Sequence, residues 1–150
     1  MNVSIFIDEA LKTIQRGTVD RKSTFKLPTL SSSIDNKVFQ RIVVARRYIE
    51  HDQSLIIYTD HESQKYHQLK TNPSCSLLFW DPKKRLQVQV AGVASFLDDK
   101  LDYWDKLNEN QKKDYVINPL PGTEISSADN YNYDSAEHRF EVISIHFKTL

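Results

Sequence analysis

The spacing of hydrophobic residues along the chain predicts three helices. Near the N-terminus, residues 4–16 carry apolar side chains three and four positions apart and are followed by Gly17, which is the pattern of one buried helix face with a glycine stop. Residues 63–72 ("SQKYHQLKTN") form a shorter candidate that ends before a proline, where helical backbone is disfavoured. Residues 98–117 return to helical spacing and predict the third helix.

Between these helices the hydrophobic period falls to two, which is the period of a strand. The stretches "VFQRIVVA" (38–45) and "SLIIYT" (54–59) are joined by the polar "RRYIEHDQ" and are predicted to pair as a hairpin. Two more strands, "SCSLLFW" (74–80) and "RLQVQVAGVASFL" (85–97), follow around the turn "DPKK". Gly92 in the second of these predicts a bulge or bend where the sheet curls.

The C-terminal third contains one more strand. Residues 138–150 ("HRFEVISIHFKTL") carry apolar side chains on both faces, which predicts a strand covered on both sides for part of its length. Residues 118–135 are rich in Pro, Gly, Asn and Ser and predict a loop, while residues 23–37 predict an irregular strand and a turn. Together the elements favour a small β-barrel or curved sheet with flanking helices, as a single domain over residues 1–150.

Composition excludes several classes of function. The chain has 20 basic and 20 acidic side chains and a formal net charge of zero, so nothing indicates nucleic acid or an anionic membrane as a partner. The single cysteine, Cys75, has no internal disulfide partner, and the five histidines lack metal-ligand spacing, so no metal site is predicted. No signal-peptide pattern and no membrane-length apolar stretch is present. We therefore expect a soluble, cytoplasmic protein.

Polar residues at the ends of the predicted strands form a candidate anion site. Ser63 and Lys65 stand at the start of the helix predicted over residues 63–72, where free backbone N–H groups attract an anion. Arg41 can add a guanidinium fork to the same phosphate if the strands bring it close. The extended backbone of residues 38–45 can also present polar groups to a planar ring such as a flavin or a pterin.

Each of these residues also has an ordinary structural interpretation. An arginine at a strand end, such as Arg41, is usually a solvated charge, and Ser63 suits a helix cap without any ligand. Tyr58 and Thr59 favour a strand for their own sake. Gln87, on the polar side of an alternating strand, reads alone as a solvent-facing side chain.

The candidate residues nevertheless occur as one ordered set, which runs through Arg41–Arg46, Tyr58–Lys65, His67–Pro73, Ser76–Trp80 and Gln87–Gly92. In order and spacing this set resembles the pyridoxamine 5'-phosphate oxidase family, whose members are FMN-binding split-barrel proteins. The resemblance implies a mainly β fold, namely an FMN-binding split β-barrel with flanking helices. It also implies a homodimer with FMN at its interface and a small-molecule substrate.

The resemblance also implies roles for individual residues. In that family the strand matching residues 41–46 lies along FMN, a Tyr-Thr pair and a Ser-x-Lys sequence hold the ribityl phosphate, and a glutamine reaches FMN at the dimer interface. The implied FMN-binding residues are Arg41, Ile42, Val43, Val44, Arg46, Tyr58, Thr59, Ser63, Gln64, Lys65 and Gln87. Arg46 is the candidate to orient an anionic substrate, whereas His67 is expected to be structural, and no catalytic acid or base is identified.

The sequence departs from the family pattern in four places. Position 64 is glutamine where the oxidases usually have arginine, which removes one phosphate cation, and Arg46 replaces a lysine. Residues 102–126 do not match the Tyr, Arg and Ser that bind pyridoxamine phosphate in the oxidases. The chain also ends at Leu150, before their C-terminal Trp and Arg-x-His segment, which indicates a short form or a truncated sequence.

These departures affect the predicted substrate more than the predicted cofactor. We expect an FMN-dependent oxidoreductase that acts on an unassigned small molecule, because the cofactor residues match better than the substrate residues do. The first alternative is a true pyridoxamine/pyridoxine 5'-phosphate oxidase. The second is a non-catalytic module that binds flavin or haem, for which the loss of arginine at position 64 and the short C-terminus are the arguments.

Overall fold

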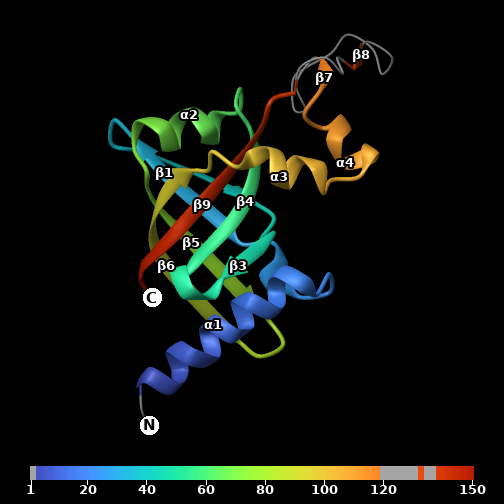
Figure 1. Ribbon diagram of the computed structural model, residues 1–150. Helices are drawn as coiled ribbons and strands as arrows, with labels where there is room; N and C mark the ends of the chain where they lie inside the picture. Colours follow the sequence, from blue (N-terminus) through green and yellow to red (C-terminus); the bar gives the residue numbers. More distant parts are fainter. Residues whose placement is uncertain (1–2, 119–131, 134–137) are drawn as a thin grey trace.

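The computed structural model describes residues 3–118, 132–133 and 138–150. Seven antiparallel strands form one sheet in the order β2-β1-β5-β6-β9-β4-β3 (Figure 1). Their bounds are β1 Thr29–Ile34, β2 Lys37–Ile42, β3 Arg47–Ile49, β4 Ser54–Asp60, β5 Ser74–Asp81, β6 Leu86–Phe96 and β9 Phe140–Thr149. The predominance of strands confirms the mainly β prediction.

Helices lie around this sheet. Their bounds are α1 Val3–Val19, α2 Gln64–Thr71, α3 Lys100–Asp105 and α4 Glu109–Lys113, with single 3-10 turns at Thr24–Lys26 and Glu50–Asp52. A separate pair of two-residue strands joins β7 Ile117–Asn118 to β8 Asn132–Tyr133. Most of the predicted loop over residues 118–135 lies outside the described residues. α1 and α2 occupy opposite ends of the sheet, and α3 crosses the outer face of β9 (Figure 1).

The predicted hairpin between residues 38–45 and 54–59 is wrong. β2 ends at Ile42 and pairs with β1 through a tight turn at Asp35–Asn36, where both residues have positive φ, as a two-residue hairpin requires. β4 pairs instead with β3, which the sequence pattern had placed in the connection. Apolar alternation identifies a strand but not its partner, because pairing depends on contacts distant in the sequence.

The segment between β2 and β3 closes the barrel. Its first part runs beside the residues that lead into β1, since the N–H of Val43 donates to the carbonyl of Pro28 at 3.0 Å and that of Ala45 to the carbonyl of Lys26 at 2.8 Å. Its last part follows β4, since the N–H of Arg46 donates to the carbonyl of Ile56 at 3.0 Å. One continuous run therefore leaves one edge of the sheet and joins the other.

The two predicted glycine positions behave differently from each other. At Gly92 the β6–β9 register shifts, which confirms the predicted bulge, and an added Cβ would lie 2.9 Å from the carbonyl oxygen of His146. Gly17 does not end the N-terminal helix as predicted, because α1 continues to Val19. An added Cβ there would lie 2.7 Å from the Cβ of Phe25, so the glycine permits close packing of the helix.

The helix predicted over residues 98–117 is two short helices. α3 ends at Asp105, and Asn108 begins α4 with a capping box, in which Asn108 and Gln111 each accept the other's backbone N–H. Such a box satisfies the free N–H groups of a new helix start, so the apolar spacing continues across a break in the helix. The prediction of helix 63–72 is confirmed by α2, which Ser63 caps.

The core has two parts, one on each face of β4 and β9. Inside the barrel, Ile143 and Ile145 of β9 join a large cluster with the inward residues of the other strands. On the outer face, Phe140 and Val142 form a second cluster with Leu107, which α3 and α4 cover. The predicted two-sided burial of the last strand is confirmed. Among the described residues, no helix combines the length and hydropathy needed to cross a bilayer.

Candidate functional site

A cleft of about 380 Å³ opens where β4 ends and α2 begins. One wall is the corner from β4 to α2. The other is formed by Asp114 and Tyr115, which come directly after α4. The lining residues are Tyr58, Thr59, Asp60, Ser63, Lys65, Asp114 and Tyr115. The cleft therefore collects four of the predicted FMN-binding residues at one place, and adds three that the sequence had not suggested.

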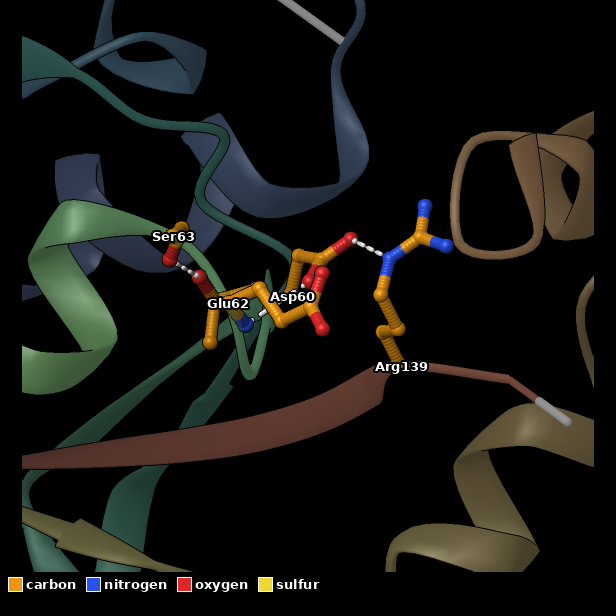
Figure 2. A network of polar contacts seen from close by, with 5 residues as sticks. Asp60, Glu62, Ser63 and Arg139 are labelled. Carbon is orange, nitrogen blue, oxygen red and sulfur yellow. Dashed lines mark hydrogen bonds and ion pairs between the residues drawn. The ribbon is translucent and has the colours of Figure 1, made fainter. Parts of the chain in front are cut away.

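The corner between β4 and α2 is a tight turn held by its own polar groups (Figure 2). The Oδ1 of Asp60 accepts the N–H of Glu62 at 2.9 Å, and its carbonyl accepts the N–H of Ser63 at 2.9 Å. The Oγ of Ser63 caps α2 by accepting the N–H of Tyr66, and it shares a 2.9 Å hydrogen bond with the hydroxyl of Thr59. One hydroxyl hydrogen of that pair remains available to a ligand.

Lys65 is the cation of the cleft. Its side chain is half-buried on the first turn of α2, and within the described part of the chain its ammonium has no hydrogen bond or ion pair. Burial lowers the pKa of Lys65; the charge of Arg41 lowers it further, and that of Asp60 raises it. The first-turn N–H groups of a helix lack an intrahelical acceptor. They carry partial positive charge, so the helix start and the ammonium of Lys65 both attract an anion.

Arg41 adjoins the cleft but does not line it. Its Nη1 donates to the carbonyl of Leu30 at 3.3 Å and to the Oγ of Ser32 at 2.9 Å, and its Nη2 donates to the Oε1 of Gln68. The guanidinium thus ties β2 and β1 to α2. Its effect on the pKa of Lys65 places it within electrostatic range of the cleft, although both of its terminal nitrogens donate to protein acceptors in the structure.

Arg46 lies on the other side of the strand run, as strict alternation predicts. Its guanidinium stands over the ring of Tyr58, 5.0 Å from the ring centre. Its Nε is buried and has no hydrogen-bond partner among the described residues. Arg46 therefore backs the Tyr58 wall of the cleft, while Arg41 faces α2.

The remaining predicted site residues are dispersed. Val43 is buried in the barrel, Val44 is half-buried, and Ile42 and Gln64 are exposed. Gln87 lies beside Trp80 at the start of β6. The opposite end of β6, where Phe96 contacts Tyr66 of α2, is roughly 30 Å away at about 3.3 Å per residue. Within one chain, Gln87 does not reach the cleft.

Sequence reasoning missed Asp60, Asp114, Tyr115 and Arg139. The Nε of Arg139 pairs with the Oδ2 of Asp60 at 2.7 Å, with both side chains 14% exposed. Burial raises the pKa of Tyr115 to about 12, so its phenol is a neutral hydrogen-bond donor at physiological pH. Asp60 stood inside the matched Tyr-Thr-Asp sequence, which was the one available signal. Nothing local marks the others, because distant segments bring them to the cleft.

Comparison with known proteins places these observations in a family. Residues 19–149 match the family model for pyridoxamine 5'-phosphate oxidase. The chain is 37% identical over 82 residues to a pyridoxine/pyridoxamine 5'-phosphate oxidase of Anaplasma phagocytophilum, covering 54% of this chain and 37% of that protein. It is 31% identical over 116 residues to the corresponding oxidase of Psychrobacter cryohalolentis, covering 75% of this chain and 50% of that protein. The chain thus spans half or less of these relatives' length.

A solved structure agrees with the family match. A pyridoxamine 5'-phosphate oxidase-related, FMN-binding protein from Nostoc punctiforme superposes with a TM-score of 0.74 at 16% identity, over 93% of this chain and 79% of that one. At this identity the likeness concerns the fold. It confirms the predicted split-barrel class.

Proposed function

The chain belongs to the pyridoxamine 5'-phosphate oxidase family, and from this premise we propose that it is a flavoprotein that binds FMN with its phosphate in the cleft beside α2. The observation that carries the proposal is Lys65, a half-buried cation without a hydrogen bond or ion pair among the described residues, at a helix start. A phosphate satisfies such a site, because its oxygens accept hydrogen bonds from both the ammonium and the free N–H groups.

The other cleft residues fit this ligand. Thr59 and Ser63 contribute hydroxyl groups, and Arg41 contributes positive charge at longer range. The exposed Gln64 can donate its amide N–H, a weaker interaction than the arginine usual in the family. Bound FMN supplies two-electron transfer, while the protein supplies position and charge around the ring. We therefore favour an FMN-dependent oxidoreductase whose small-molecule substrate is unassigned.

Arg46 is the proposed contact for an anionic substrate. Its guanidinium is held against Tyr58, and its Nε has no partner in the described part of the chain. A buried donor without an acceptor is costly, so an anion that reaches this guanidinium gains a hydrogen bond the protein does not already use. The proposal for the substrate therefore specifies only that it carries a negative charge.

The test of the proposed function is the flavin content of the purified protein. We expect a yellow protein whose absorbance spectrum is that of an oxidised flavin and which releases FMN, identified by mass, on denaturation. A colourless protein that takes up no added FMN would contradict the proposal. Incubating loaded protein with pyridoxamine 5'-phosphate in air then addresses the first alternative. Without pyridoxal phosphate and peroxide, a true oxidase is excluded.

The proposed homodimer has a suitable surface on the outer face of β2, β1, β5 and β6. Exposed apolar side chains gather on this face, at Val38, Ile42, Leu78 and Trp80. Cross-strand pairing puts Gln87 directly beside Trp80. A second copy packed here would cover these residues and give Gln87 a route to the partner's FMN, which accounts for its distance from the cleft of its own chain.

Trp80→Glu is expected to convert this dimer to monomer, because it buries a charge in an apolar interface. Sedimentation velocity measures the change directly. Leu101→Glu is the matched control: Leu101 is 58% exposed, also apolar, and lies on α3 away from this face. A wild-type protein that sediments as a monomer would refute the homodimer, and dissociation by Leu101→Glu instead would place the interface elsewhere.

A further inference from the structure

The cleft contains a carboxylate beside the proposed phosphate position. Asp60 lines the cleft, and its charge raises the pKa of Lys65, so the two groups interact through space. A negative charge in this half-buried setting repels a phosphate, and the repulsion is stronger than in water because the local dielectric constant is lower. A phosphate therefore binds here more tightly when the charge of Asp60 is neutralised.

Arg139, the residue just before β9, supplies the positive charge that neutralises Asp60. Its Nε donates to the Oδ2 of Asp60 at 2.7 Å (Figure 2). Its backbone N–H donates to the carbonyl of Tyr115 at 2.9 Å, and its carbonyl accepts the N–H of His61 at 2.8 Å. Arg139 is thus bonded to both walls of the cleft, and its guanidinium, not its backbone, carries the charge.

We propose that Arg139 is a positioning residue for phosphate recognition, whose guanidinium cancels the charge of Asp60 so that the cleft accepts the phosphate of FMN beside Lys65. This inference rests on the proposed function, because it takes the cleft to be the phosphate site. It assigns to Arg139 an electrostatic effect exerted through Asp60 and no direct contact with the ligand.

A purely structural role makes a different prediction. If the ion pair only fastened β9 to the β4–α2 corner, its loss would weaken every ligand of the cleft alike. If it acts on charge, its loss weakens FMN but not riboflavin, which has the same ring and ribityl chain without the phosphate. The backbone bonds of Arg139 to Tyr115 and His61 do not depend on its side chain, so they persist when the side chain is changed.

The experiment measures the dissociation constants of FMN and riboflavin by quenching of flavin fluorescence. Arg139→Gln is expected to weaken FMN binding by roughly 10- to 100-fold, because the unpaired carboxylate of Asp60 then repels the phosphate at the lowered dielectric constant of the cleft, and to leave riboflavin unchanged. The second substitution, Asp60→Asn, keeps an oxygen for the N–H of Glu62. Adding it to Arg139→Gln should restore most of the lost FMN affinity, since the unpaired charge is removed.

Lys100→Gln is the matched control. It breaks another 2.7 Å ion pair on β9, with Glu141, but lies outside the cleft lining, so neither flavin should bind differently. Equal losses of FMN and riboflavin in Arg139→Gln, or no recovery in the double variant, would overturn the inference while leaving FMN binding by the wild type intact. A wild type that binds neither flavin would instead refute the proposed function, and this inference with it.

Asp60→Asn alone provides a test that does not require Arg139→Gln to fold. It removes one negative charge from the cleft lining, so FMN should bind a few-fold more tightly at low ionic strength, and riboflavin should not. Weaker FMN binding in this variant would show that the carboxylate supports the phosphate site, which contradicts the proposal.

Discussion

Replacing Lys65 with alanine is expected to raise the dissociation constant of FMN by roughly 10- to 150-fold, since a hydrogen bond to a charged group is worth about 1.5–3 kcal/mol. The loss is large for a single lysine because the ammonium is half-buried and, among the described residues, has no other hydrogen bond or ion pair. Removing it leaves a phosphate with the helix start, the one hydroxyl hydrogen that the Thr59–Ser63 pair can donate, and the distant Arg41.

Lys70→Ala is the control for this change. Lys70 lies on the same helix α2, but it is exposed, and its ammonium stands over the rings of Tyr66 and Phe96 outside the cleft. Fluorescence titration of both variants with FMN and riboflavin separates loss of the phosphate contact from general damage to the helix. If Lys65→Ala binds FMN as the wild type does, the phosphate lies elsewhere.

Replacing Phe140 with alanine is expected to lower the free energy of unfolding by about 3–5 kcal/mol, the usual cost of emptying a phenylalanine site in a core. Phe140 is fully buried in the outer cluster, with ring centres 5.0 Å from Tyr58 and Tyr115 and 5.5 Å from Trp104. Its loss removes the ring contacts that β9 makes with Tyr115 and with Trp104 of α3. Urea unfolding gives the energy, and hydrogen exchange should show faster opening of α3 and α4.

Phe79→Ala separates the two parts of the core. Phe79 is also fully buried, but in the barrel cluster, so the same deletion should cost a similar amount of stability. It should not selectively speed hydrogen exchange in α3 and α4, and it should weaken flavin binding less than Phe140→Ala does. Equal exchange in the two variants would mean that the outer cluster does not hold these helices on its own.

The elements of the fold could be predicted wherever their causes are local. Ser63 begins a helix because its own hydroxyl caps it, and the helix ends at Thr71 because Pro73 follows two residues later. Pairing was not predictable in this way. The run that begins at Lys37 has the same apolar alternation whether it pairs with β1 or with β4. It bonds to both because the barrel closes there, which is a property of the whole sheet.

In the candidate site too, the residues that are close in sequence could be predicted and those from distant segments could not. Tyr58, Thr59, Ser63 and Lys65 are close in sequence, and one turn brings them together. Asp60 and Arg139 are 79 residues apart, and no short pattern links them. Tyr115 was placed in a predicted helix because its neighbours have helical spacing, and its position depends on a break at Asn108 that apolar periodicity does not reveal. The FMN roles of Ile42 and Gln87 stay predictions.

The run that crosses from β1 to β4 acts as a spacer of fixed length. Val43 and Ala45 anchor it to one edge of the sheet, and Arg46 anchors it to the other, so no slack lies between the two attachments. Surface loops absorb insertions because their ends can move; here, adding or deleting one residue turns every later side chain to the opposite face. Tyr48, which packs in the barrel cluster, would then point out of it. An insertion in this crossing is therefore expected to disturb the pairing of β3 with β4, which an insertion in a surface turn would not do.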